Sequence, residues 1–291
     1  MIVLTPIATA QTTRRLLQEL KLSPNKSLGQ NFLISTPVAK RIEQAAQIKD
    51  SGHVLEIGPG LGALSEILAE KAGALTLLEL DGRLYLHLSR LFADNPTVEV
   101  INGDALSFHY TAYATARKWR EYQVVANLPY NITSVLVQNL LLNGGPWHSL
   151  TLMVQQEVAQ KLLSAHFGEA EGPLALLLQY YGLGKMLFTV PPASFFPAPQ
   201  IDSAVVQVIR HPQPPFAVAD AEMFWRFLNA AFSHRRKTLV NSLNDHFGNG
   251  GGFWRQALLS CGLTENRRAE QLSLHEYGAL FALPQVQEYL L

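Results

Sequence analysis

The stretch HVLEIGPGLGALSEILAEKAG (53–73) decides the fold of this chain. It begins with an apolar run typical of a buried strand, passes through the turn GPGLG (58–62) and ends in a helix-like pattern. A glycine-rich turn between strand and helix lets the backbone approach a ligand closely, and the helix N-terminus adds donor amides. The spacing is GxGxG with a proline inside, whereas the dinucleotide fingerprint is GxGxxG. We therefore predict a nucleotide-type cofactor that carries no phosphate.

Six more short apolar runs follow with the spacing of βα units. They are ALTLLEL (74–80), TVEVING (97–103), YQVVANL (122–128), LTLMV (150–154), GKMLFTV (184–190) and SAVVQVI (203–209). The last two are joined by the proline-rich PPASFFPAP (191–199), which has no helical pattern, so we expect them to pair antiparallel. The sequence predicts a Rossmann-like α/β fold with seven mostly parallel strands and an antiparallel last pair.

A proline-rich segment marks the candidate domain boundary. HPQPPF (211–216) holds three prolines in six residues, which is typical of a linker. After it, helix-period spacing such as MFWRFLNAAF (223–232) indicates a small all-α domain. We predict an N-terminal extension over residues 1–20 that can be disordered, a cofactor-binding domain over 21–210 and a helical domain over 217–291.

Composition and charge restrict the class of protein. With 48% apolar and 16% charged residues, the 291-residue chain is an ordinary globular protein. Lys plus Arg equals Asp plus Glu at 23 each, so a nucleic-acid surface would have to be a local patch. The single Cys261 allows no intrachain disulfide, the N-terminus lacks the order of a signal peptide, and no apolar run has the roughly 18 residues of a membrane span. We expect a cytoplasmic protein.

Acidic residues stand at three predicted strand ends. Glu79 lies 21 residues after Gly58, about where doubly wound folds place the acid that binds ribose. Asp104 follows the next strand and can accept from an adenine amino group, while Glu56 lies near any positive amino or sulfonium group. Each acid alone could equally be a turn residue. Together they favour S-adenosylmethionine, a cationic adenosine compound, over a pyrophosphate.

The fourth strand ends in NLPYN (127–131), which suits transfer to an exocyclic base amine. Such an amine is a poor nucleophile, and two acceptors aimed at its protons would stabilise the developing charge. Asn127 offers a side-chain oxygen, Leu128 or Pro129 a main-chain carbonyl, and Tyr130 a face on which an extruded adenine can stack. A lone NLPY would usually be a plain turn. Its place beside the cofactor site, at the edge where open α/β sheets bind ligands, favours chemistry.

Eight motifs follow one another along roughly residues 21–281. They are KSLGQNFL (26–33), EIGPGLGALSEIL (56–68), LELD (78–81), GDAL (103–106), NLPYNITS (127–134), VPPASFFPAPQIDSAVV (190–206), AFSHRRKTLVNSL (231–243) and RAEQLS (268–273). In these motifs and in their order, the chain resembles the bacterial 16S ribosomal RNA adenine dimethyltransferases of the KsgA or RsmA type.

The resemblance implies dimethylation of two adjacent adenosines in a hairpin loop near the 3′ end of 16S rRNA, with S-adenosylmethionine, on the small-subunit precursor. It implies an S-adenosylmethionine-dependent methyltransferase domain at 21–210, an RNA-binding helical domain and no metal. Nine residues would contact the cofactor and five would hold the target base. The cofactor residues are Asn31, Leu33, Glu56, Gly58, Gly60, Glu79, Asp104, Ala105 and Asn127; the base residues are Asn127, Leu128, Pro129, Tyr130 and Phe195.

The candidate RNA-binding residues are three consecutive cations, Arg235, Arg236 and Lys237, in a stretch that reads as helical. A short charge run is more often a solvated face, but the resemblance favours RNA. Further phosphate contacts could come from Arg14, Arg15, Lys21 and Lys26. The family's basic or aromatic residues are replaced at several positions, which weakens the inference about RNA grip. These departures are Leu28, Gln156, Gln200 and the segment 171–175.

Two other functions compete with this one. A large-subunit antibiotic-resistance adenine methyltransferase shares the fold, and a non-catalytic ribosome-assembly or transcription factor could retain it. The intact Gly58, Glu79, Asp104 and NLPY argue against a decayed site. The lone Cys261 lies in the helical tail, so a cysteine-adduct mechanism has no nucleophile, and no two histidines lie four apart as in a helical zinc pair. We expect a monomer.

Overall fold

The computed structural model describes residues 6–25, 29–49, 52–248 and 250–290. The chain divides into two compact units, Met1–Ala159 with Lys185–Arg210 and Gln160–Gly184 with His211–Leu291. The second unit thus takes in residues 160–184, which lie inside the range predicted for the first domain. The functional limits 21–210 and 217–291 stay predictions.

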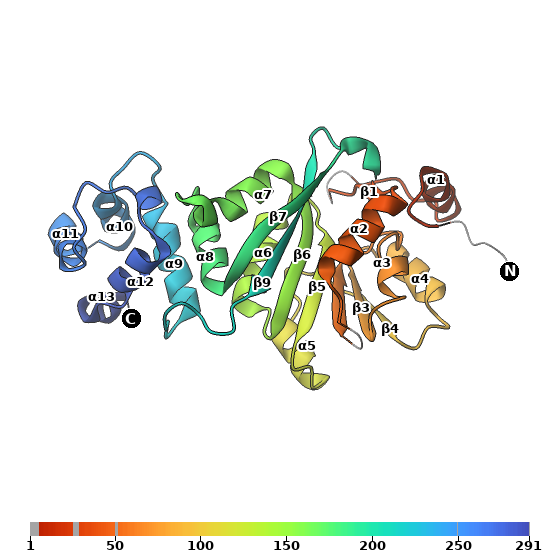
Figure 1. Ribbon diagram of the computed structural model, residues 1–291, viewed down its shortest axis with the longest axis horizontal. Helices are drawn as coiled ribbons and strands as arrows, with labels where there is room; N and C mark the ends of the chain where they lie inside the picture. The colour runs from red at the N-terminus through yellow and green to blue at the C-terminus, as the bar shows by residue number, and fades with distance from the viewer. Residues whose placement is uncertain (1–5, 26–28, 50–51, 249, 291) are drawn as a thin grey trace. The chain divides into compact units, whose positions relative to one another are not determined.

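A seven-stranded sheet forms the centre of the first unit (Figure 1). The strands run in the order β4-β3-β2-β5-β6-β9-β7. Strands β4, β3, β2, β5 and β6 pair parallel, and β9 pairs antiparallel with β6 and lies between β6 and β7. The Rossmann-like prediction is therefore confirmed. The strands are β2 (His53–Ile57), β3 (Ala74–Glu79), β4 (Val98–Asn102), β5 (Tyr122–Asn127), β6 (Trp147–Gln155), β7 (Gly182–Val190) and β9 (Ser203–Arg210).

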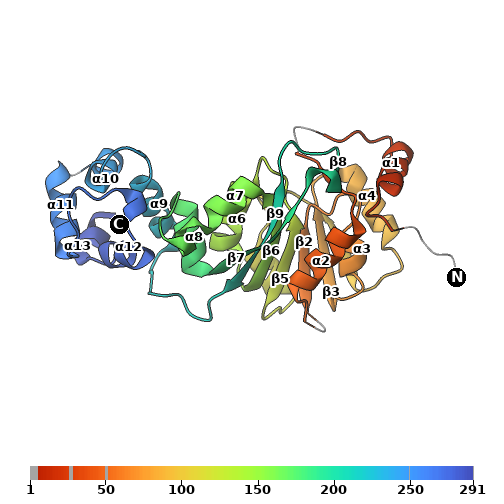
Figure 2. The ribbon, with the colours of Figure 1, turned by 45° about the horizontal axis from the view of Figure 1, so that its top comes forward.

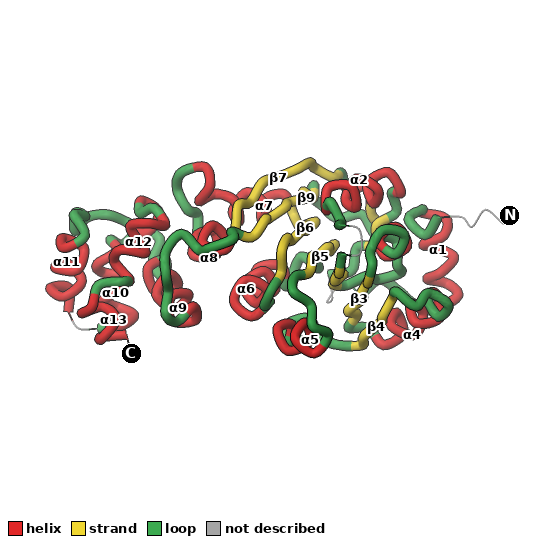
Figure 3. The backbone as a smooth tube through the Cα atoms, turned by 60° about the horizontal axis from the view of Figure 1, so that its bottom comes forward, coloured by secondary structure: helices red, strands yellow, loops and turns green. Residues whose placement is uncertain are grey.

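Helices cover both faces of this sheet, with α2 on one side and α5 and α6 on the other (Figure 3). Short polar side chains start several helices: Ser35 accepts from Val38 at the start of α2, and Asp81 accepts from the amides of Arg83 and Leu84 at the start of α4. The helices are α1 (Ala10–Glu19), α2 (Thr36–Ala46), α3 (Ser65–Leu68), α4 (Gly82–Leu91), α5 (Tyr110–Ala116), α6 (Thr133–Asn143) and α7 (Gln156–Leu163).

A second, two-stranded sheet joins β1 (Phe32–Leu33) to β8 (Phe195–Phe196), just after the turn η2 (Pro192–Ser194). Phe32 is opposite Phe196, and Leu33 is opposite Phe195. This pairing could not be predicted from the sequence, because two-residue strands carry no periodicity. It brings the GQNFL motif beside the proline-rich segment between β7 and β9.

The second unit is built mainly of helices (Figure 2). Aromatic side chains form its core. Phe227 lies against Trp254, Tyr277 and Phe281, with ring centroids 6.2, 6.3 and 5.5 Å away. These side chains are buried, so the helical tail has a core of its own. Its elements are η1 (Ser164–Phe167), α8 (Pro173–Tyr181), α9 (Ala221–Ala231), α10 (Leu239–Phe247), α11 (Gly250–Ser260), η3 (Ala269–Gln271), α12 (Leu274–Phe281) and α13 (Pro284–Leu290).

Candidate functional site

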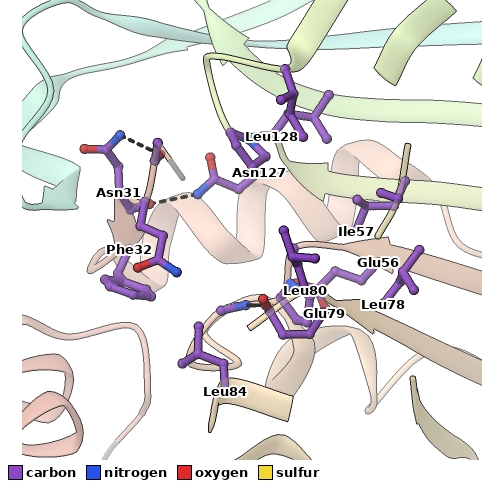
Figure 4. Close-up of a pocket in the computed structure, with 18 of the residues that line it drawn as sticks. Asn31, Phe32, Glu56, Ile57, Leu78, Glu79, Leu80, Leu84, Asn127 and Leu128 are labelled. Carbon is purple, nitrogen blue, oxygen red and sulfur yellow. Dashed lines mark hydrogen bonds between the residues drawn. The ribbon is translucent and has the colours of Figure 1, made fainter. Parts of the chain in front are cut away.

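A cavity lies at the carboxyl ends of β2, β3, β4 and β5, with the residues before and within β1 forming another wall (Figure 4). Parallel strands end at the same edge of a sheet, which is why residues far apart in sequence meet here. All nine residues predicted to bind the cofactor line this cavity. They are Asn31, Leu33, Glu56, Gly58, Gly60, Glu79, Asp104, Ala105 and Asn127.

The glycine loop forms the floor between β2 and α3. Gly60 has a φ of +62°, a left-handed conformation that favours glycine, and an added Cβ would lie 3.3 Å from the Phe32 ring. Its N–H donates to the Glu79 Oε2 over 3.0 Å. The loop is therefore held by the acid at the end of the neighbouring strand.

Glu79 is a buried carboxylate with two backbone partners. Its Oε1 accepts from the Asp81 N–H at 2.9 Å, and its Oε2 accepts from Gly60. Burial raises the pKa of Glu79, the backbone N–H groups of Asp81, Gly60 and Leu80 oppose the rise, and the Asp81 charge adds to it. Each carboxylate oxygen can accept more than one hydrogen bond, so both remain able to accept from a ligand hydroxyl.

Asp104 and Ala105 occupy the turn after β4. The Asp104 Oδ1 accepts from the Leu106 N–H at 2.8 Å, which fixes this turn, while the carboxylate stays exposed. Leu80 and Leu106 also line the cavity and are 51% and 37% exposed. Such exposed apolar side chains suit the faces of a flat ring. Neither leucine is among the residues predicted from the sequence, although each stands within two residues of a predicted acid.

Glu56 differs from the other acids because it is almost sealed from solvent. It is 2% exposed, and its Oε2 has no hydrogen-bond partner among the described residues. Burial raises the pKa of Glu56 to about 8, with the Ser65 hydroxyl opposing the rise and the nearby Glu79 adding to it. At neutral pH the ligand-free site therefore holds a mostly neutral acid, which a ligand cation would convert to the carboxylate.

Asn127, at the end of β5, has a fixed amide orientation. Its Nδ2 donates to the Asn31 main-chain carbonyl over 3.1 Å (Figure 4). Only the NH₂ side of the amide can donate, so the Oδ1 is directed elsewhere and has no donor among the described residues. The cavity thus presents an acceptor whose orientation is set by a bond between β5 and the segment leading into β1.

The turn after Asn127 distinguishes the two candidate carbonyls. The Pro129 carbonyl accepts from the Thr133 hydroxyl at 3.0 Å and from the Ile132 N–H at 3.3 Å, so its two lone pairs are engaged. The Leu128 carbonyl accepts from no described residue outside regular helix or strand bonding. Tyr130 also lines the cavity, and its hydroxyl lies 2.6 Å from the Ser203 Oγ in β9, which anchors the ring.

Phe195 is not among the described residues that line the cavity. Its side chain is 2% exposed and belongs to the hydrophobic cluster that includes Leu33 and Val190. The role of Phe195 at the target base stays a prediction. The pairing of β8 with β1 buries this ring, and the motif alone did not reveal that.

The three candidate RNA-binding cations lie in the connection between α9 and α10, and not in a helix as the sequence suggested. All three are exposed. The Lys237 Nζ donates to Asp245 at 2.6 Å, whereas Arg235 and Arg236 have no acidic partner among the described residues. Of the N-terminal cations, Arg15 pairs with Glu19, and Lys26 lies outside the described residues, as does Leu28.

Comparison with known proteins identifies the family. The family model described as ribosomal RNA adenine dimethylase matches residues 21–285. The chain belongs to this family. It is 38% identical over 279 residues to ribosomal RNA small subunit methyltransferase A of Streptococcus pneumoniae strain CGSP14, covering 94% of this chain and 96% of the relative, and equally to that of strain P1031. The family resemblance inferred from the motifs is confirmed, as is its implication that the chain is an rRNA adenine dimethyltransferase.

Two solved structures are also similar. The 23S rRNA methyltransferase ErmE aligns with a TM-score of 0.65 at 25% identity, over 86% of this chain and 98% of its own. A dimethyladenosine transferase from Plasmodium falciparum aligns with a TM-score of 0.71 at 23% identity, over 89% and 98%, and this likeness concerns the fold.

Among the described residues, no cluster of three or more His, Cys, Asp or Glu could hold a metal ion. None of the helices in the described ranges is long and apolar enough to cross a bilayer.

Proposed function

We propose that this enzyme uses S-adenosylmethionine to dimethylate the 6-amino groups of two adjacent adenosines in a hairpin loop near the 3′ end of 16S rRNA, during small-subunit assembly. The observation that supports the chemistry is the hydrogen bond that the Asn127 Nδ2 donates to the Asn31 carbonyl. This bond fixes the side-chain amide and leaves its Oδ1 free to accept a hydrogen bond from the substrate. The 38% identity to small-subunit methyltransferases supports the choice of RNA.

The target amine would sit between two acceptors. The Asn127 Oδ1 and the Leu128 carbonyl each accept a hydrogen bond from one N–H of the amine. These two bonds favour the pyramidal nitrogen that attacks the methyl group. Tyr130, held by Ser203, supplies a face for the extruded adenine. After the first transfer one proton remains, so the amine must rotate and re-enter with its methyl beside Asn127. The product ammonium is acidic enough to lose its proton to solvent or to a carbonyl.

The cavity residues fit S-adenosylmethionine, which supplies an electrophilic methyl group on sulfur when bound. Glu79 accepts from the ribose hydroxyls, Asp104 accepts from the adenine amine, and Leu80 and Leu106 cover the ring faces. The unpartnered Glu56 oxygen suits the positive end of the cofactor.

Glu56 should make cofactor binding depend on pH. With a pKa of about 8 in the empty site, Glu56 must lose a proton when a cation binds beside it, so affinity should rise between pH 6 and 8 by up to about tenfold per unit and level off above pH 8. Calorimetry across this range checks the slope. S-adenosylhomocysteine separates the causes: if the sulfonium is responsible, this neutral-sulfur product binds with a flatter profile.

Glu56→Gln is the matched variant, and its cofactor affinity should lose most of the pH dependence. An unchanged slope in the variant would remove Glu56 from the cationic end of the site.

The same variant should change the pH dependence of folding stability. Because the folded-state pKa of Glu56 is raised, its ionisation costs stability as pH rises from the unfolded-state pKa through about 8. The ligand-free variant should therefore melt higher than wild type at pH 8, by about 2 to 4 °C for each kcal/mol gained.

The exposed arginines between α9 and α10 are proposed to contact RNA phosphates. Arg235→Gln with Arg236→Gln should weaken binding to 30S particles and reduce the slope of log affinity against log salt by about one unit for each lost contact. Lys237→Gln should have a smaller effect, since Asp245 already neutralises this cation. Cofactor affinity is the control and should not change. Equal salt slopes for wild type and double variant would make these residues a solvated surface.

One experiment tests the substrate. Incubation with labelled S-adenosylmethionine and unmethylated 30S particles, followed by mapping, should place two methyl groups on each of two neighbouring adenosines. Modification of naked 23S RNA instead would support the antibiotic-resistance alternative. Cofactor binding without transfer to either RNA would support a non-catalytic assembly factor. We further propose that the enzyme acts in the cytoplasm as a monomer.

A further inference from the structure

Residues ahead of the family match are built into the first unit. The extension that the sequence allowed to be disordered contains α1, started by Thr9, whose side chain accepts from the Thr12 N–H. Ile7, Ala8 and Leu17 are 7%, 1% and 6% exposed. They belong to the hydrophobic cluster that also holds Phe32, Leu33 and Leu61 from the cavity walls. The family model begins at residue 21, so this segment lies ahead of the part that the family model matches.

The segment is attached first to the glycine loop. The Ile7 N–H donates to the Glu66 Oε2 over 3.0 Å, and Glu66 lies in α3, directly after the loop. The Glu66 N–H in turn donates to the Gly62 carbonyl at 3.0 Å. A Cβ added to Gly62 would be 3.7 Å from the Ile7 Cδ1. Ile7 therefore contacts the helix start that follows the loop and packs near its last glycine.

The second attachment, one residue later, is to the start of α2, just after β1. The Ala8 carbonyl accepts from the Thr36 hydroxyl at 3.1 Å, and Thr9 forms an antiparallel bridge with Ser35. Ser35 caps α2 and follows Leu33 by two residues, so this contact fixes the end of β1. The Arg14 guanidinium also lies 5.4 Å from the centroid of the Phe196 ring in β8.

We propose that the segment Pro6–Leu20 is a positioning element of the cofactor site, which joins the glycine loop to the wall that carries Asn31 and Leu33. Three consecutive residues, Ile7 to Thr9, bond to α3 on one side and to the start of α2 on the other. One ligand can contact both the glycine loop and the segment with Asn31 and Leu33 only if the distance between them is right. Small displacements in a binding site weaken such contacts steeply. The inference rests on the proposed function, since it assumes that this cavity holds S-adenosylmethionine.

Two neutral substitutions at Glu66, which differ in whether an acceptor oxygen remains, test the first attachment. Glu66 does not line the cavity, and Glu66→Ala removes the acceptor of the Ile7 N–H. We expect its dissociation constant for S-adenosylmethionine to rise roughly three- to tenfold, with the rate at saturating cofactor little changed. Glu66→Gln keeps an acceptor oxygen and should restore affinity close to wild type. Glu70→Ala, exposed after α3, is the matched control.

Truncation tests the whole segment. Deleting residues 2–8 removes Ile7 and Ala8 and should weaken cofactor binding by about tenfold or more, whereas deleting residues 2–5 leaves both attachments and should not. Melting curves accompany each measurement. A lower melting temperature with unchanged cofactor affinity in Glu66→Ala and in the longer deletion would overturn the proposal and leave the segment a purely stabilising part of the fold. Failure of the wild-type chain to bind the cofactor would instead refute the proposed function.

Discussion

Asn127→Ala should reduce methyl transfer to rRNA by roughly 100-fold or more, the usual size for the loss of one transition-state partner. The side chain supplies the acceptor that the structure orients through Asn31. The Leu128 carbonyl remains in the variant, so a residual rate is expected. Single-turnover assays on unmethylated 30S particles with saturating cofactor measure the effect on the chemical step.

Two controls separate chemistry from binding in this variant. Asn143→Ala, at the exposed end of α6, removes the same functional group away from the cavity and should retain full activity. Affinity of Asn127→Ala for the 30S particle should match that of wild type. Its cofactor affinity must be measured as well, because the lost bond to Asn31 also holds a cavity wall. Full activity of Asn127→Ala, or a wild-type end product with a single monomethylated adenosine, would refute the mechanism.

Glu79→Ala should weaken S-adenosylmethionine binding by an order of magnitude or more. A hydrogen bond to a charged group contributes about 1.5 to 3 kcal/mol, and this carboxylate also holds the amides of Gly60 and Asp81. The variant therefore loses the ribose acceptor and the anchor of the glycine loop together. Calorimetry on the ligand-free protein gives the affinity directly.

Glu79→Gln refines this prediction. The glutamine amide keeps one acceptor oxygen, but its NH₂ group would face a backbone N–H that donates to the carboxylate in wild type. We therefore expect a cofactor affinity intermediate between those of wild type and Glu79→Ala. Glu70→Ala serves again as the control for loss of an exposed carboxylate. If Glu79→Ala binds the cofactor as tightly as wild type, Glu79 has no part in the site.

Several features could be predicted because they are local in sequence. Each of the seven strands is an apolar run bounded by turn or loop residues. The observed β2, β3 and β5 differ from the predicted runs by one residue at one end. The glycine turn and the residues that follow β2, β3, β4 and β5 could be placed in one site without knowing any contact. Parallel βα units bring the carboxyl ends of their strands to one edge, so chain order alone implies proximity.

Other features depend on contacts between residues distant in the chain. Asn127 and Asn31 are 96 positions apart, and only their hydrogen bond decides which amide atom accepts. The pairing of β1 with β8 buries Phe195, a placement that its motif did not predict. The hydrogen bond from Ile7 to Glu66 spans 59 positions and involves a segment without a recognisable motif.

The periodicity of apolar residues shows which face of an element is apolar, so the sequence by itself determined the strands and the residues at their ends. It does not report which distant surface covers that face, so only the tertiary structure decided the orientation of Asn127, the burial of Phe195 and the place of the N-terminal segment.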